Sequence, residues 1–280
     1  MTHCGVVGHP AAHSLSPVMH REAYRLLGLT DWRYGWYDVA PGEFGAFVAS
    51  RDASWRGLSV TMPHKEAAAR LGDPDAEVRL TGVANTVVWH DQGRRSVHNT
   101  DVAGFVAALA PGGVPAAATV LGAGATARSA IVALARLGVR AVEVKARSYE
   151  KVRRLVEWAG RDVPLGPGGR GYTAGDWESP QDPSAALIIS TLPHDAAGPL
   201  ADTLRLAPGG PLLTVFDVAY DPWPTPLAAA ALASGVGVLD GVDLLAHQAV
   251  AQVRLMTSGE VDAAPLLSVA RAELRRRAGA

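Results

Sequence analysis

A short glycine-containing turn near the middle of the 280-residue chain constrains the fold most strongly. It directly follows the apolar run Ala117 to Leu121 and opens a helical pattern from Arg128 to Leu137. One glycine permits the tight turn, a second lets the backbone approach a pyrophosphate, and a small third residue allows close helix–strand packing. Unpaired N–H groups at the helix start favour phosphate. The pattern predicts a dinucleotide site formed by Gly122, Ala123, Gly124, Ala125, Thr126 and Ala127.

The strands expected around this turn predict a parallel sheet. They are short apolar runs separated by helical stretches, which is typical of crossover connections: Ala117 to Leu121, Val142 to Val144, Leu187 to Ile189 and Leu213 to Phe216. A Gly- and Pro-rich stretch, Pro164 to Pro183, interrupts the series and is expected to be an exposed excursion. A plain strand-to-helix turn remains the alternative for residues 122 to 127, and the surrounding strand–helix–strand pattern argues against it.

The remaining sequence indicates a second α/β domain. Strand-like and helix-like segments alternate over the first hundred residues, and they include a hairpin from Ala84 to Asn99. A helix from Val102 to Leu109 ends in a Pro- and Gly-rich hinge. The last forty residues carry two helical patterns that can pack back on the first domain, as 280 residues exceed one usual domain.

Composition narrows the classes of partner. The chain has 26 basic and 27 acidic residues, so it carries no electrostatic footprint for nucleic acid or an anionic membrane. No apolar run approaches the roughly 20 residues of a membrane span, and histidines and cysteine show no metal-ligand spacing. The single cysteine, Cys4, allows no internal disulfide, and no secretory signal is evident. We therefore expect a cytoplasmic protein with a small-molecule partner and no metal, as a monomer or homodimer.

The end of the second strand of the nucleotide domain predicts the cofactor. A site for NAD usually has an aspartate or glutamate there, which holds the ribose 2′-hydroxyl. This chain instead has Lys145, Ala146, Arg147 and Ser148, whose two cations and hydroxyl suit the 2′-phosphate of NADP. The alternative is that both cations are solvated and that Glu143 holds the ribose.

Three polar segments stand out in the first domain. Ser16 can cap a helix that has Pro17 at its first position, which leaves Ser14 free to complete a carboxylate pocket with it. Pro63 is expected to start another helix and to place Lys65, one of three lysines, in its first turn. Asp101 follows a strand and opens a helix, where a simple cap is the alternative role.

These segments occur in one order along the chain: Ser14–Pro17 (SLSP), Thr61–Lys65 (TMPHK), Ala84–Thr86 (ANT), Asn99–Asp101 (NTD), Gly122–Ala125 (GAGA) and Asp240–Ala249 (DGVDLLAHQA). Together they resemble the shikimate dehydrogenase family from end to end. The resemblance implies two α/β domains. Residues 1–101 plus 240–280 would form a substrate-binding catalytic domain, and residues 102–239 would form a Rossmann-like NADP-binding domain.

The resemblance also assigns roles to residues. Lys65 and Asp101 would form the acid–base pair that reduces the ring ketone of 3-dehydroshikimate to shikimate with NADPH. The substrate contacts would come from Ser14, Ser16, Thr61, Asn85, Asp101, Tyr220 and Gln248. Besides the turn and the strand end, Thr191, Val218 and Gly241 would lie on the cofactor side.

Three residues depart from the family pattern: Ser59 and Ala146 replace asparagines, and Ala125 replaces a glycine. They leave the choice of cyclic polyol and the strictness of NADP selection open. Quinate/shikimate and aminoshikimate dehydrogenases would use the same pair. A shikimate-pathway ligand sensor without turnover is the alternative from another class, and the presence of both Lys65 and Asp101 argues against it.

Overall fold

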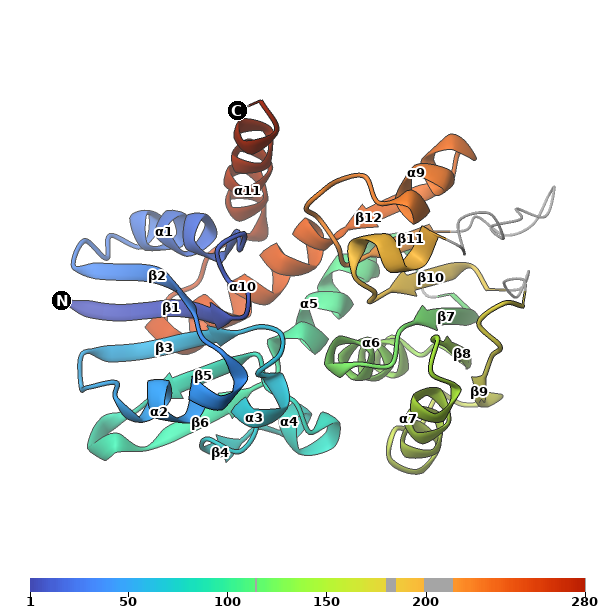
Figure 1. Ribbon diagram of the computed structural model, residues 1–280, viewed down its shortest axis with the longest axis horizontal. Helices are drawn as coiled ribbons and strands as arrows, with labels where there is room; N and C mark the ends of the chain where they lie inside the picture. The colour runs from blue at the N-terminus through green and yellow to red at the C-terminus, as the bar shows by residue number, and fades with distance from the viewer. Residues whose placement is uncertain (114, 180–184, 199–213, 280) are drawn as a thin grey trace. The chain divides into compact units, whose positions relative to one another are not determined.

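The computed structural model describes residues 1–113, 115–179, 185–198 and 214–279. The chain divides into two compact units (Figure 1). Unit 1 comprises Met1–Gly104 and Leu245–Ala280, and unit 2 comprises Phe105–Leu244. Both divisions fall a few residues after the expected ones. The first residues of α5 (Thr100–Leu109) therefore belong to unit 1, and the first residues of α10 (Gly241–Thr257) belong to unit 2.

Unit 1 is built on a mixed sheet with the order β2-β1-β3-β5-β6-β4. Its strands are β1 (Thr2–Gly8), β2 (Trp32–Asp38), β3 (Trp55–Val60), β4 (Asp73–Pro74), β5 (Thr86–Trp89) and β6 (Arg95–His98). β1 runs parallel to β2 and β3, whereas β5 is antiparallel to β3 and β6. The expected hairpin is therefore confirmed, with the short helix η2 (Asp91–Gly93) as its connection.

The register of this sheet gathers the polar segments at one edge. Ser59 near the end of β3 is paired with Thr86 at the start of β5, and Thr86 is paired with His98 at the end of β6. Val7 at the end of β1 is paired with Val60 of β3. Consequently Ser14, Lys65, Asn85 and Asp101 all lie beyond the same end of the strands.

The helices of unit 1 are α1 (Ser16–Leu26), α2 (Phe44–Ala49) after η1 (Pro41–Glu43), α3 (Lys65–Ala68), α4 (Ala76–Thr81), α11 (Ala263–Ala278), the first half of α5 and most of α10. Two expected helix starts were wrong. The cap of α1 is Leu15, and the Ser14 hydroxyl accepts the N–H of Ser16 at 3.2 Å. α3 begins at Lys65 rather than Pro63, and His64 is its N-terminal cap.

Unit 2 holds an all-parallel sheet with the order β12-β11-β10-β7-β8-β9. Its strands are β7 (Ala117–Leu121), β8 (Ala141–Lys145), β9 (Gly171–Ala174), β10 (Leu187–Ser190), β11 (Thr214–Asp217) and β12 (Gly237–Asp240). Its described residues form η3 (Ala110–Gly112), α6 (Ala125–Arg136), α7 (Tyr149–Asp162), η4 (His194–Ala197) and α9 (Pro226–Ala233), besides the end of α5 and the start of α10. Numbered from its first strand, the order is 3-2-1-4-5-6, that of dinucleotide-binding folds.

The expected apolar strands are confirmed at β7, β8, β10 and β11, although Leu213 lies outside the described residues. β7 and β10 are buried along their whole length, as central parallel strands require. The prediction of an exposed excursion over 164–183 was wrong for 171–174, which form the edge strand β9 beside β8. An edge strand is covered on one side only, so its half-polar sequence gave no apolar signal; residues 180–183 lie outside the described ones.

Candidate active site

A lysine–aspartate ion pair is the chemical centre of unit 1. Lys65 Nζ donates to Asp101 Oδ2 at 2.6 Å, and the two side chains are only 13% and 7% exposed. Lys65 opens α3, and Asp101 lies in the first turn of α5. A buried ion pair is costly unless further hydrogen bonds hold it. The neighbouring residues supply those bonds.

Asn85 connects this pair to the helix α10. Its Nδ2 donates to Asp101 Oδ1 at 2.8 Å and lies 3.2 Å from Gln248 Oε1. Its Oδ1 accepts the backbone N–H of Thr100 at 2.8 Å. Asn85 and Gln248 are 3% and 4% exposed. Asn85, Asp101 and Gln248 were all expected to bind substrate, and the structure brings them together; Thr100 was not anticipated.

The loop before Lys65 is fixed by packing and backbone bonds. His64 is buried, stacks on Phe44 with ring centroids 4.4 Å apart, and lies 2.8 Å from the Val39 carbonyl through Nε2. The Thr61 N–H donates to the Val7 carbonyl at 2.9 Å. These contacts set where Lys65 starts its helix and leave the Thr61 side chain half-buried.

The two expected carboxylate ligands differ in environment. Ser14 is half-buried, and its hydroxyl accepts the N–H of Ser16, so the Ser14 oxygen is oriented at the start of α1. Ser16 is 3% exposed and is the first residue of α1. Ser14 therefore has a structural partner that sequence reasoning had not given it.

The glycine turn in unit 2 lies where the strand order reverses. Gly122 has φ +111°, which favours glycine, and a Cβ there would approach Thr191 Oγ1 to 2.3 Å. Thr191 follows β10, and its hydroxyl donates to the Leu121 carbonyl at 2.9 Å. Gly124 is the N-terminal cap of α6, and because it has no side chain it forms no capping hydrogen bond with the first N–H groups of the helix. Gly122 and Thr191, both expected to bind the cofactor, are thus brought together; Ala123, Ala125, Thr126 and Ala127 continue the turn into α6.

The end of β8 places its polar residues differently. Lys145 is fully buried, and its Nζ donates to the Ser179 carbonyl at 3.1 Å and lies 3.5 Å from Glu143 Oε2. Ser148 caps α7 by accepting the N–H of Lys151. Arg147 is exposed and Ala146 is half-buried. Lys145 and Glu143 are therefore engaged with one another inside unit 2, and Arg147 is the strand-end cation on the surface.

The remaining expected residues of unit 2 form a third contact. A Cβ on Gly241 would come within 2.0 Å of the Val218 carbonyl oxygen and 3.0 Å of the Tyr220 ring. The Gly241 N–H donates to the Ala219 carbonyl at 3.3 Å. Only a glycine fits the start of α10 here. Val218, Tyr220 and Gly241 are thus adjacent, although Tyr220 was expected among the substrate ligands and Gly241 in the first domain.

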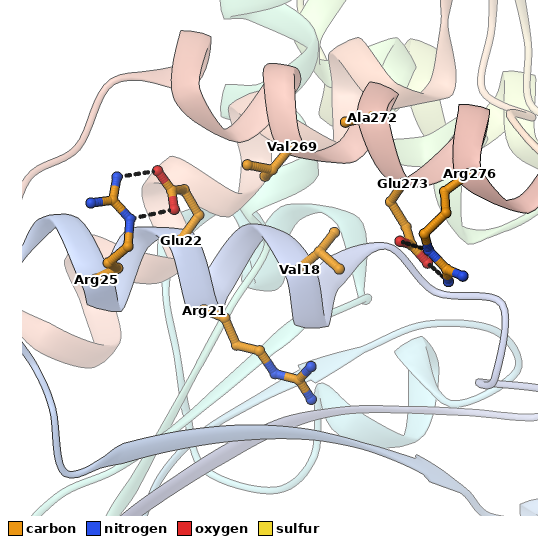
Figure 2. A pocket seen from close by; sticks show the side chains of 8 residues that line it. All are labelled: Val18, Arg21, Glu22, Arg25, Val269, Ala272, Glu273 and Arg276. Carbon is orange, nitrogen blue, oxygen red and sulfur yellow. Dashed lines mark hydrogen bonds and ion pairs between the residues drawn. The ribbon is translucent and has the colours of Figure 1, made fainter.

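A groove of about 470 Å³ lies between α1 and α11 (Figure 2). Val18, Val269 and Ala272 line it together with charged residues that already form ion pairs, Glu22 with Arg25 and Glu273 with Arg276. Its eight lining residues include none of the expected site residues. The described residues contain no helix that is both long and apolar enough to cross a membrane, and no group of three or more His, Cys, Asp or Glu placed to hold a metal ion.

A dinucleotide-type parallel sheet in one unit and a buried lysine–aspartate pair in the other place the chain among two-unit α/β oxidoreductases. The model of the shikimate dehydrogenase substrate binding domain matches residues 6–87. A shikimate dehydrogenase (NADP(+)) of Rhodopseudomonas palustris (strain HaA2) is 37% identical over 253 residues, covering 88% of this chain and 86% of the relative. The chain belongs to the shikimate dehydrogenase family.

Solved structures agree with this assignment. The shikimate dehydrogenase of Mycobacterium tuberculosis is 37% identical and superposes with a TM-score of 0.85, covering 98% of this chain and 100% of that one. The shikimate 5-dehydrogenase of Thermus thermophilus, in complex with NADP(H) and shikimate, is 30% identical with a TM-score of 0.82 and covers 97% and 99%. The expected family and two-domain α/β class are confirmed.

Proposed function

We propose that this protein is an NADP-dependent shikimate dehydrogenase, which reversibly reduces the ring ketone of 3-dehydroshikimate to the hydroxyl of shikimate. The 2.6 Å pair of Lys65 with Asp101, buried at the edge of the unit 1 sheet, is the observation that carries the proposal. A ketone reduction needs a proton donor where negative charge develops. A buried ammonium held by a carboxylate is suited to that task.

In the proposed reaction Lys65 donates a proton to the ketone oxygen as negative charge develops there. NADPH, when bound, supplies the hydride to the ring carbon. Asp101 holds the Lys65 ammonium through Oδ2, while its Oδ1 accepts from Asn85, so the carboxylate cannot rotate away. In the reverse direction Lys65 takes the proton from the shikimate hydroxyl, and Asp101 keeps it in place.

The substrate is proposed to lie along the same edge of unit 1. Thr61, Asn85, Asp101 and Gln248 supply hydroxyl, amide and carboxylate groups for ring hydroxyls, and their positions are fixed by the contacts described above. Ser14 and Ser16 are proposed to bind the carboxylate at the start of α1, where N–H groups and the helix dipole favour an anion. Tyr220 is proposed to contribute from unit 2.

The residues of unit 2 fit NADP. Gly122 makes the tight turn against Thr191, and an added Cβ on Gly124 would meet nothing within 4 Å, so the backbone there is open to a pyrophosphate. The helix α6 begins after Gly124, which has no side chain to occupy its first N–H groups. Arg147 at the end of β8 is proposed to bind the 2′-phosphate with Ser148 and Ala146 beside it. Because Lys145 and Glu143 pair inside the unit, we assign the main charge contact to Arg147. Val218 and Gly241 are proposed to line the nicotinamide end.

One assay tests the proposed function and its nearest alternatives. NADP reduction should be measured with shikimate, quinate and aminoshikimate in parallel, and each should be repeated with NAD. We expect the highest kcat/KM for shikimate with NADP. A preference for quinate or aminoshikimate would reassign the substrate, and binding of shikimate without any turnover would identify a ligand sensor instead.

The compartment and assembly state are part of the proposal. A chain with Cys4 as its lone cysteine forms no internal disulfide, which suits a reducing cytoplasm. We propose a monomer or a homodimer there.

A further inference from the structure

A buried amide on α10, Gln252, contacts both sides of the candidate site and has no part in the reaction described above. Gln252 is 1% exposed and lies one helical turn after Gln248. Its Oε1 accepts the hydroxyl of Ser59 at 2.7 Å. Its Nε2 donates to the Asn85 carbonyl at 3.1 Å and to Thr86 Oγ1 at 2.9 Å. Both polar ends of the amide are therefore used.

The first branch from Gln252 reaches the acid–base pair. Thr86 Oγ1, having accepted from Gln252, donates to Asn85 Oδ1 at 2.9 Å. Asn85 Nδ2 then donates to Asp101 Oδ1 at 2.8 Å. The Thr86 hydroxyl and the Asn85 amide each accept one hydrogen bond and donate the next, so the path has a single direction. Thr86 is fully buried and Asn85 nearly so, which removes competing water.

The second branch reaches α1 at His20. The Tyr34 hydroxyl donates to Ser59 Oγ at 2.6 Å, and the Ser59 hydroxyl in turn donates to Gln252 Oε1. The Tyr34 ring stacks on the His20 ring of α1 with ring centroids 4.1 Å apart. Burial raises the pKa of Tyr34, so its phenol keeps the proton that it donates.

His20 completes this arrangement. Its Nε2 lies 3.2 Å from Gln252 Oε1, and that carbonyl oxygen can only accept, so Nε2 carries the hydrogen. Burial lowers the pKa of His20 to about 4, and the ring is neutral near pH 7. We call Gln252, Ser59, Tyr34, His20 and Thr86 the Gln252 network.

We propose that Gln252 is a positioning residue, which holds Asp101, through Thr86 and Asn85, in register with α1, the helix at whose start the two serines lie, through Ser59, Tyr34 and His20. This inference rests on the proposed function. In the proposed function the serines at the start of α1 bind the substrate carboxylate, and Lys65, held by Asp101, protonates the ketone oxygen. The substrate reacts fast only if the distance between these two groups of residues stays fixed. Misplacement by about 1 Å can cost on the order of 10²-fold in rate.

Two substitutions at Gln252 test the proposal. Gln252→Leu keeps much of the volume and removes both polar ends, and Gln252→Glu keeps an acceptor for Ser59 but loses the donor to Thr86. The probe is a single turnover of 3-dehydroshikimate with NADPH, in which the rate constant reports each folded molecule and the amplitude reports the active fraction. We expect the rate constant to fall about tenfold or more in Gln252→Leu and less in Gln252→Glu, with unchanged affinity for NADP.

Arg254→Ala is the matched control, since Arg254 lies on the same helix with a 72% exposed side chain. It should leave the rate constant unchanged. If Gln252→Leu does not fold, Ser59→Ala is the second variant. It removes one oxygen, interrupts the hydrogen bonds from Tyr34 to Gln252, and should still lower the rate constant. A lower amplitude with an unchanged rate constant would overturn the positioning role and leave a structural one. A wild-type protein without shikimate turnover would refute the proposed function instead.

Discussion

Lys65 is the residue whose chemistry the structure defines most narrowly. Its ammonium is held at 2.6 Å from Asp101 in a setting that excludes most water. Removing it takes away proton donation at the transition state while leaving the groups proposed to bind the ring. We expect Lys65→Ala to lower kcat by about 10²- to 10⁴-fold with little change in shikimate affinity.

Steady-state kinetics and equilibrium binding of shikimate measure the two effects separately. Asp101→Asn should also lose activity, and the double variant should lose less than the sum of the two single effects because the pair acts as a unit. Near-normal turnover in Lys65→Ala would contradict the acid–base assignment.

Arg147 is the residue on which we expect cofactor choice to depend. A charge-assisted contact to the 2′-phosphate is worth about 1.5 to 3 kcal/mol. Arg147→Ala should therefore lower kcat/KM for NADP by at least about tenfold and leave that for NAD nearly unchanged. Lys145→Met is a useful comparison, since Lys145 is buried against Glu143 and Ser179 and should affect stability more than the ratio. An unchanged NADP-to-NAD ratio in Arg147→Ala would show that the arginine is merely solvated.

His20 gives the protein a pH-dependent stability. Its pKa is about 4 in the folded chain and near 6.5 when unfolded, so between these values the unfolded chain binds more protons. The stabilisation is fully present above pH 6.5 and is lost as pH falls toward 4, by up to about 3 kcal/mol. Urea unfolding of wild type and His20→Gln from pH 4 to 7 isolates this effect, because the other titrating groups are shared. Parallel stability curves would rule out the buried neutral imidazole.

At the scale of elements, the start of α1 combines a structural and a binding task. Ser14 accepts the N–H of Ser16, so Ser14→Ala should cost roughly 1 kcal/mol of stability, as the loss of one intramolecular hydrogen bond does. Replacing both serines by alanine should also raise the KM for shikimate. NADP affinity, measured by fluorescence titration, should not change, since NADP is assigned to unit 2. Equal weakening of both ligands would indicate a folding defect only.

The elements differ in how far sequence could predict them. The buried parallel strands β7, β8 and β10 and the turn at Gly122 follow from local apolar runs and glycine positions, and they were predicted. α4 and β9 were not, because neither carries a strong apolar period. The edge strand β9 has a neighbouring strand on one side only. The short helix α4 is fixed at its start by Asp75, whose side chain accepts the backbone N–H of Val78.

The site shows the same division. Lys65, Asn85, Asp101 and Gln248 were found through motifs, and the structure brings them together. Gln252 was missed, although it lies four residues after Gln248 on a helix and so faces the same side. Its partner Ser59, and Tyr34, which bonds Ser59, are far away in sequence. Only the strand order β2-β1-β3-β5 of the folded sheet brings these two residues and Thr86 together. The pairing of Lys145 with Glu143 was missed as well, because the sequence does not show that the Lys145 side chain turns into unit 2.

At the scale of the whole molecule, the two units are assigned different ligands, and this division is testable. NADP alone should protect amides in residues 122–127 and 191 of unit 2 from hydrogen exchange, while shikimate alone should protect residues 61–65 and 85–86 of unit 1. Exchange detected by mass spectrometry reports both at once. Protection of unit 1 by NADP alone would contradict the assignment of the ligands to separate units.

The discontinuity of unit 1 also bears on how the protein is made. Lys65 and Asp101 leave the ribosome early, but Gln248 and Gln252 follow only after all of unit 2. A contiguous unit can fold as it emerges, at synthesis rates of about 5 to 20 residues per second. Unit 2 can therefore mature while the first 104 residues still wait for their last helices. Until α10 arrives, the acid–base pair lacks Gln248 and the Gln252 network, so a prematurely terminated chain would be able to carry cofactor but not to reduce substrate.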